Sequence, residues 1–359
     1  MTVGTGQVVR ADQLRSLATA ALGAVGMPDR DAELTADAMV WADLRGLTAH
    51  GVTAKLPQCV RRVRAGGTAA AAAIRVVSET SAVLSLDAGD AWGQVAAGRG
   101  MEAAIGKATT AGCGVAVVRN ASSAAALGYF PMLAVEQRMV GLAVTNSPAL
   151  IAPTGGTTRV LGNQAHALGC PAGRHHPLLF DSSTTTLSTG EMDLLHERGE
   201  LLPEGVLLDA AGVSTRDPGQ WRTGTLLPAG GHRGYGLSLM FEVLTGVLAG
   251  GPIWGHQVGH PSLYDQPQGV SLFMLAIDPT QAMAYGDFVA RVDRLIDEIH
   301  ASPPAAGFDR VYVPGERGAL TAAERERDGI PLSPERVSAL RALLEELGVL
   351  WSPDGPSGL

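Results

Sequence analysis

Lysine, aromatic residues and cysteine are scarce in this chain of 359 residues. Lysine occurs only as Lys55 and Lys107, and 27 basic side chains stand against 35 acidic ones, so the formal net charge is −8. A nucleic-acid-binding protein needs a clustered basic surface to neutralise phosphates, and this balance argues against that class. The 46% of apolar residues is typical of a folded protein, and the length predicts roughly two domains.

The three cysteines, Cys59, Cys113 and Cys170, lie far apart and form no Cys-x-x-Cys pair. This excludes a zinc ribbon and a thioredoxin-type redox motif, and it is typical of a reducing compartment. The first ten residues lack the apolar run of a signal peptide. No stretch reaches the roughly 18 apolar residues of a membrane span. We therefore expect a cytoplasmic protein.

Several motifs of nucleotide-binding and hydrolytic enzymes are also missing. The chain has no Gly-x-Gly-x-x-Gly between a strand and a helix, no Gly-Lys-Ser/Thr of a P-loop and no Gly-x-Ser-x-Gly. The adjacent His175 and His176 cannot both face one ion from a regular helix, and no metal site is predicted. A nucleotide would therefore bind on a scaffold other than the Rossmann fold.

The spacing of apolar residues predicts an α/β fold, with strands and helices alternating in the middle of the chain. Ser333 followed by Pro334 marks the start of a final helix. The expected helices cover about residues 12–25, 29–46, 54–64, 93–110, 230–249 and 333–347. The expected strands cover about residues 82–86, 115–118, 140–145, 168–171, 178–181, 270–277 and 311–313.

One candidate for proton transfer is His50, which directly precedes Gly51 in the segment Ala42–Val52. The unperturbed pKa of histidine, ~6.5, suits acid–base chemistry at neutral pH. A histidine beside glycine in a loop can approach a substrate closely. From the spacing alone, His50 also fits a surface or helix-contact role.

Polar residues follow several of the expected strands. Asn120 and Ser123 come after the strand at 115–118, and Ser147 comes after the strand at 140–145. Ligands often bind where strands of an α/β sheet end, which makes these residues candidates for binding. The alternatives are a helix cap at Ser122 or Ser123 and a plain turn at Ser147.

Further along the chain, Phe180–Thr184 ends a strand with an acid and hydroxyls that fit a ribose, an amide or a helix cap. In Gly230–Gly236, four glycines surround His232 and Arg233 at the start of a helix. Free backbone N–H groups beside arginine favour a phosphate or anion site, although tight packing also explains such glycines. The segment Val313–Glu316 by itself indicates a turn.

Taken in order, these segments resemble the type 2 malate/L-lactate dehydrogenase family over about residues 8–350. Its relatives act on ureidoglycolate, sulfolactate, diketogulonate and cyclic imino acids. The motifs that carry the resemblance are ADLRGLTAHGV (42–52), GGHRGYGL (230–237), VPGE (313–316), VTNS (144–147) and FD (180–181).

The resemblance implies a non-Rossmann NAD(P)-binding α/β fold with a central mixed sheet. A helical domain built from both chain ends, residues 1–75 and 280–359, would pack on a central cofactor and substrate domain, residues 76–279. Members of the family are typically homodimers, with the site near the domain and subunit boundary.

The resemblance also implies roles for single residues. His50 would donate or accept the proton while a hydride moves between NADH or NADPH and the substrate carbon. In this chain, Lys55 or Arg233 is expected to hold an anionic group of the substrate, and Asn120 is expected to bind substrate as well. The expected cofactor contacts are Ser147, Asp181, Ser182, Ser183, His232, Arg233, Gly234, Gly315 and Glu316.

The chain departs from the family pattern mostly on the substrate side. The second family histidine, a proton acceptor in some members, falls on Ser123, and serine is no base near pH 7 unless another group activates it. Ala49 stands where the family has serine, and Ala54 where it has a substrate-binding arginine. One hypothesis is an oxidoreductase of a 2-oxo or 2-hydroxy acid, an imine or a related metabolite. The alternative is a non-redox enzyme (cyclisation, elimination or isomerisation) or a non-catalytic dimeric partner.

Overall fold

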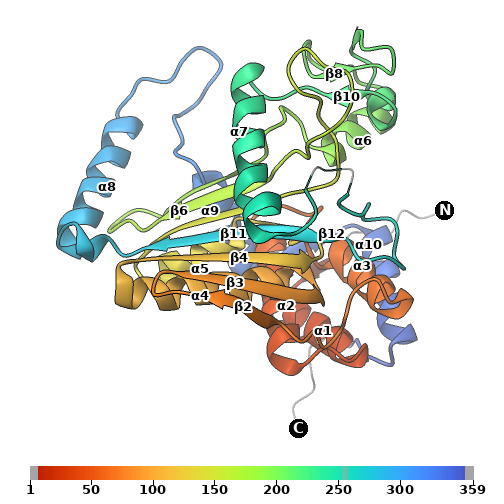
Figure 1. The fold of residues 1–359 in the computed structure, drawn as a ribbon, viewed down its shortest axis with the longest axis horizontal. Coiled ribbons are helices and arrows are strands. Elements are labelled where there is room, and N and C mark those ends of the chain that lie inside the picture. The colour runs from red at the N-terminus through yellow and green to blue at the C-terminus, as the bar shows by residue number, and fades with distance from the viewer. Residues whose placement is uncertain (1–6, 254, 256, 352–359) are drawn as a thin grey trace.

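The computed structural model describes residues 7–253, 255 and 257–351. Its centre is a seven-stranded mixed sheet in which only β3 and β4 are parallel neighbours (Figure 1). In spatial order the strands are β2 (Arg75–Glu79), β3 (Val83–Ala91), β4 (Cys113–Ala121), β11 (Val270–Ile277), β5 (Val140–Thr145), β6 (His166–Cys170) and β7 (Leu178–Ser182). The expected α/β fold with a central mixed sheet is confirmed.

The central strand β11 comes from far along the chain and inserts between β4 and β5. Its Phe273 lies opposite Val117 of β4 and Val144 of β5. The segment is an almost unbroken apolar run, which is typical of a strand that is buried on both faces. The register therefore joins two halves of the chain that are more than a hundred residues apart.

Helices cover both faces of this sheet. On one face, Val118 and Met274 share an apolar cluster with Met101 of α4 (Gly93–Ala111), and α5 (Tyr129–Glu136) packs beside it. On the other, Val117 and Phe273 pack against α7 (His232–Glu242) and the π-helical turn Val243–Val247 that follows it (Figure 1). The alternation of one residue per face is what the period of a strand requires.

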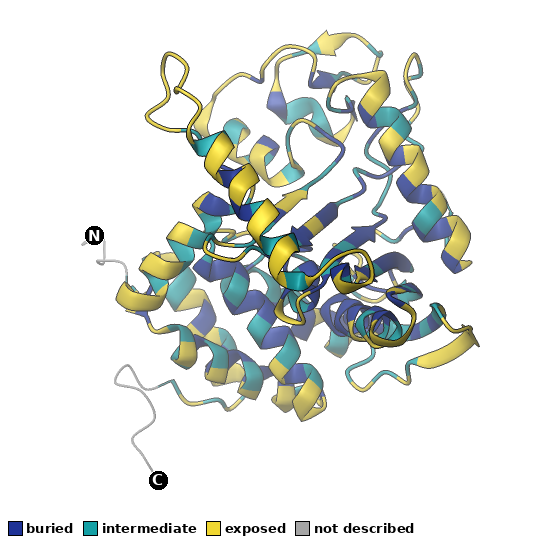
Figure 2. Cartoon of the chain, turned by 90° about the vertical axis from the view of Figure 1, so that its left-hand side faces the viewer, coloured by how far each residue is buried: buried dark blue, intermediate teal, exposed yellow. Residues whose placement is uncertain are grey.

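The two ends of the chain pack together beside the sheet. Buried leucines of α1 (Ala11–Ala24), α3 (Val52–Ala65) and α10 (Pro334–Glu346) form one apolar cluster with Met39 of α2 (Asp29–Leu44). Strand β1 (Gln7–Val9) pairs with β12 (Ile330–Leu332) in the same region. Figure 2 shows helices of the protein with buried residues along one side and exposed residues along the other. The domain limits at residues 75 and 280 stay a prediction.

A small lobe lies beyond the β6–β7 side of the sheet, at the top of Figure 1. Helix α6 (Thr189–Arg198) begins with a capping box in which Ser188 and Glu191 bond each other's backbone N–H groups. A short sheet, the 3-10 turn Pro218–Arg222 and a buried core around Met192 complete the lobe. The strands of this sheet are β10 (Thr225–Leu226), β8 (Leu207–Leu208) and β9 (Ser214–Thr215).

Three expectations for the C-terminal half need correction. The expected strand at 311–313 is wrong, because the N–H of Val313 donates to the side chain of Glu316 instead of a neighbouring strand. Helix α9 (Glu316–Asp328) begins where only a turn was expected. Helix α8 (Tyr285–His300), after the 3-10 turn Pro279–Gln281, was not anticipated. Across the part of the chain described, no helix is long and apolar enough to cross a membrane.

Candidate active site

The loop between α2 and α3 carries His50 and is shaped by a buried carboxylate. Asp43 is fully buried at the end of α2 and accepts a hydrogen bond from the N–H of Val52 at 2.8 Å. A Cβ atom on Gly51 would lie 1.8 Å from Asp43 Oδ1, so only glycine fits between them. The sequence pattern singled out His50 in this motif and missed Asp43.

His50 is uncharged at neutral pH. The protein packed around its ring, and then the charge of Lys55, lower its pKa to about 4. Its Nδ1 atom is buried and, among the residues described, has no hydrogen-bond partner. The neutral imidazole can accept a proton, and its lowered pKa makes it a weaker base than an ordinary histidine.

Lys55 lies one turn into α3 on the same side as His50. Desolvation by the surrounding protein lowers its pKa. Within the described ranges, the one hydrogen bond of its Nζ atom goes to Gln58 Oε1, at 3.3 Å. An ammonium group with a single neutral partner is poorly compensated and can pair with an anion. The structure thus brings the predicted proton carrier and the predicted anion-binding residue together.

The last residues of β4 and those that follow the strand are held by side chains from elsewhere in the fold. Asn120 has a left-handed backbone (φ 57°), and its Nδ2 donates to Asp87 Oδ1 at 3.0 Å. Ser123 is exposed, and its N–H donates to Gln268 Oε1 at 3.1 Å. Ser122 accepts from the N–H of Gly93, so the expected cap at these serines belongs to the start of α4 and not to α5.

Shared packing connects this segment to the His50 loop. Val52 and Leu56 of α3 belong to the same apolar cluster as Trp92 and Val95 at the start of α4. The next residue after Trp92 is the glycine that bonds Ser122. The His50 loop and the segment around Ser123, the two sides of the predicted substrate site, are therefore both attached to the packed start of α4.

Two segments expected to contact a cofactor meet through Asn163. Ser147 Oγ donates to Asn163 Oδ1 at 2.8 Å and accepts from its N–H at 3.1 Å. The N–H of Thr184 donates to Asn163 O, and the N–H of Ala229 donates to Thr184 O, both at 2.8 Å. These bonds also reach the glycine-rich turn before α7. Sequence reasoning missed this role of Asn163 and Thr184, since both act through backbone positions set by the fold.

The N-terminus of α7 has the features of an anion site. His232 and Arg233 are exposed there, and Gly234 is buried. The cap residue Gly231 has a positive φ of 62°, and no side chain caps the helix. Backbone N–H groups at a helix N-terminus attract anions, and a guanidinium group adds charge. This terminus therefore fits the pyrophosphate of a nicotinamide dinucleotide.

Three of the remaining predicted cofactor residues lie at the end of β7, with Asp181 and Ser182 on opposite faces of the strand and Ser183 directly after it. Asp181 reaches the N–H of Gly128 at 2.8 Å, and although it keeps contact with solvent, the surrounding protein raises its pKa to about 6. Ser182 donates to the carbonyl of Ser183, whose hydroxyl bonds Thr185. These short-range bonds leave both serines free to exchange partners with a ligand.

Asp181 and Gly315 line a cavity of about 420 Å³ together with Phe180, Tyr312 and Arg317. The next residue, Glu316, is buried and does not line this cavity. Desolvation would raise its pKa, but hydrogen bonds from the N–H of Val313 and from His300 Nε2, with the charges of His300 and Arg310, hold it below its usual range. Its carboxylate is thus occupied within the protein.

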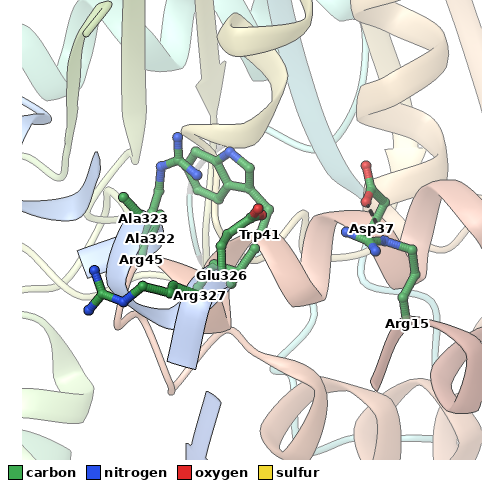
Figure 3. A pocket seen from close by; sticks show the side chains of 9 residues that line it. Arg15, Asp37, Trp41, Arg45, Ala322, Ala323, Glu326 and Arg327 are labelled. Atoms are coloured by element: carbon green, nitrogen blue, oxygen red, sulfur yellow. Dashed lines mark hydrogen bonds and ion pairs between the residues drawn. The ribbon is translucent and has the colours of Figure 1, made fainter. Parts of the chain in front are cut away.

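A larger cavity, of about 630 Å³, lies between α2 and α9 and contains none of the predicted site residues (Figure 3). Arg45 stacks over Trp41 at 4.1 Å on one side of it, and Arg15 pairs with Asp37 at 2.8 Å on the other. Arg327, which also lines this cavity, pairs with Asp328 outside it, and the predicted site lies elsewhere.

Comparison with known proteins gives the family. The profile described as malate/L-lactate dehydrogenase matches residues 9–341. The chain belongs to this family. It is 35% identical over 356 residues to the malate dehydrogenase of Pyrococcus horikoshii, which covers 97% of the chain and 96% of the relative.

Two further relatives of this malate/L-lactate dehydrogenase family member carry other names. The ureidoglycolate dehydrogenase (NAD(+)) of Escherichia coli K12 is 31% identical over 310 residues, covering 86% of the chain and 87% of the relative. The solved sulfolactate dehydrogenase of Methanocaldococcus jannaschii superposes with a TM-score of 0.89 at 31% identity, covering 96% and 98%. The family member is therefore an oxidoreductase, and the non-redox alternative gains no support.

Proposed function

We propose that this family member moves a hydride between a nicotinamide cofactor and a small anionic 2-hydroxy or 2-oxo acid, with His50 as the proton carrier. The observation that supports this most is that Lys55 in α3 lies near enough to His50 for its charge to lower the pKa of the imidazole, while its own Nζ atom bonds the neutral Gln58. An imine with a carboxylate is the second candidate substrate, because the same two groups serve a C=N bond.

In the direction of alcohol oxidation, the hydroxyl proton passes to a ring nitrogen of His50 as the hydride leaves the substrate carbon. A bound nicotinamide supplies the hydride acceptor, or the donor in the reverse direction. Lys55 pairs with the substrate carboxylate or sulfonate and keeps it in place. Asn120, whose Nδ2 is held by Asp87, presents its carbonyl oxygen, and Ser123 lies exposed beside it.

For the cofactor, we propose that the N-terminus of α7 with His232, Arg233 and Gly234 holds the pyrophosphate. Ser147, Ser182 and Ser183 would bond the sugar or the carboxamide. Asp181 and Gly315 would contact the cofactor from the cavity of about 420 Å³ that they line, and the buried Glu316 would support this cavity without touching the cofactor. Either NADH or NADPH fits this arrangement.

We also propose a homodimer in the cytoplasm. Apolar side chains are exposed along α7 and the π-helical turn that follows it, among them Met240 (56%), Val247 (54%) and, directly after the turn, Leu248 (55%). A second copy of this chain is the partner that would cover these side chains beside the exposed His232 and Arg233. Light scattering of the purified protein should give twice the chain mass, and a monomer would contradict the proposal.

The decisive experiment is a titration of the pure protein with NADH and NADPH, followed by fluorescence and calorimetry. Saturable binding of at least one is expected, and binding of neither would overturn the proposal. With the preferred cofactor, 2-oxo acids and cyclic imines are then screened for hydride transfer. His50→Gln should lower kcat by roughly 10²–10⁴-fold while cofactor affinity stays the same.

A further inference from the structure

Arg62 is a buried cation whose hydrogen bonds, among the residues that the structure describes, all go to neutral groups. It lies near the end of α3, is 2% exposed, and is among the largest fully buried side chains of the protein. Its guanidinium donates to the carbonyls of Leu263 at 2.9 Å and Gln266 at 2.5 Å, to two further carbonyls and to a threonine hydroxyl. Burying a charged group costs desolvation free energy, which hydrogen bonds to the group offset in part. Here those bonds also hold another part of the chain in place.

What Arg62 holds is the loop of residues 259–268, which packs on the C-terminal end of α3. A Cβ atom on Gly67 would lie 2.3 Å from the carbonyl oxygen of Tyr264, so the loop backbone touches the helix end directly. Since α3 also carries Lys55, the loop and the anion-binding residue are parts of one rigid unit.

The end of this loop reaches the other side of the site through Gln268, which is 4% exposed. Its Nε2 donates to Gly259 O at 3.3 Å, while the N–H of Gly259 donates back to its carbonyl at 2.7 Å. Its Oε1 accepts the N–H of Ser123 at 3.1 Å. The side chain is thereby oriented at both ends, and the position of Ser123 depends on it.

We propose that Gln268, fixed by the clamp of Arg62 on the 259–268 loop, is the positioning residue that sets the backbone of Ser123 and so the width of the substrate side of the site. The inference rests on the proposed function, since only that function places Ser123 beside the substrate. The loop sets the spacing between Ser123 and the helix that carries Lys55. It therefore decides which length of anionic substrate spans the two.

The test replaces Gln268 by leucine, which keeps the volume and removes both bonds. Amide hydrogen exchange in the peptide around 118–128 should become about 10-fold faster, and KM for the anionic substrate should rise about 5- to 20-fold while the cofactor Kd stays the same. Gln268→Glu keeps an acceptor for the N–H of Ser123, so its exchange rate and its KM should both stay close to those of the wild type. Gln266→Leu is the matched control, because only the backbone of Gln266 serves the clamp.

Unchanged exchange at 118–128 in Gln268→Leu would overturn the proposal, as would an equal rise of KM in the Gln266 control. Loss of thermal stability without a change in KM, and without rescue by glutamate, would assign Gln268 a purely structural role and overturn it too. The exchange measurement needs no substrate. If the wild-type protein binds no dinucleotide, the proposed function fails while the link from Gln268 to Ser123 is still tested.

Discussion

The carboxylate of Asp43 and the backbone N–H of Val52 are joined by a 2.8 Å hydrogen bond that spans the loop carrying His50. The bond ties the end of one helix to the start of the next. It holds a proton carrier in a short, glycine-containing loop without using a side chain of the loop itself.

Gly51→Ala should disrupt this arrangement. The new Cβ atom would lie 1.8 Å from Asp43 Oδ1, so the carboxylate or the loop must move. We expect a loss of roughly 1–3 kcal/mol in the free energy of unfolding, and a fall of kcat/KM of at least about 10-fold. Gly106→Ala in α4 is the control, since its Cβ atom meets nothing within 4 Å and should be neutral or stabilising. Equal behaviour of the two variants would contradict the prediction.

Asp43→Asn should change how stability depends on pH. Burial raises the pKa of Asp43 from 3.8 to about 6, so its contribution to stability is complete below pH 3.8 and is lost as the pH rises through 6. The free energy of unfolding of the asparagine variant, relative to that of the wild type, should therefore rise by up to about 3 kcal/mol between pH 4 and pH 7. Urea unfolding at both pH values measures this, and a constant difference would rule out a titrating carboxyl here.

The rate of alcohol oxidation should be insensitive to His50 titration at mildly acidic pH. Its pKa is lowered to about 4, so the neutral base is already present well below the ordinary value of 6.5. We expect kcat/KM for oxidation to show no histidine inflection from pH 5 to pH 8. A break near pH 6.5 that disappears in His50→Gln would show that the ring is not desolvated as the structure indicates.

Lys55→Met should separate binding from chemistry. Removal of the ammonium group takes away the partner of the substrate anion, so KM should rise roughly 10- to 100-fold with a smaller change in kcat. The pKa of His50 should rise, because the charge of Lys55 is its second cause of depression. Lys107→Met removes the other lysine of the chain, which pairs with Glu79 on the surface, and should leave both parameters unchanged.

Local pattern was sufficient for most of the elements that support the site. Helix α2 begins at Asp29 as expected, and β5 and β11 have the expected limits, because apolar spacing and glycine or proline breaks decide such segments. Helix α8 was missed although its signal is in the sequence, because Phe288, Val292, Ile296 and Ile299 recur at helical spacing along it.

Contacts between distant residues could not be foreseen. The carboxylate of Glu316 bonds His300 and Arg310, and the motif Val313–Glu316 contains no pattern that predicts these partners. Gln268 reaches Ser123 across 145 positions of sequence. The site residues named from the motifs keep their assigned roles as predictions, while the residues that hold them in place emerge only from the fold.

The insertion of β11 between β4 and β5 has a consequence for the way this chain is made. Until residue 277 has left the ribosome, the sheet consists of two unjoined halves, β2–β4 and β5–β7, each with an exposed apolar edge. The last strand pair, β1 with β12, closes only after residue 332. Assembly therefore waits for the C-terminal third of the chain, so folding should be slow and open to aggregation during synthesis.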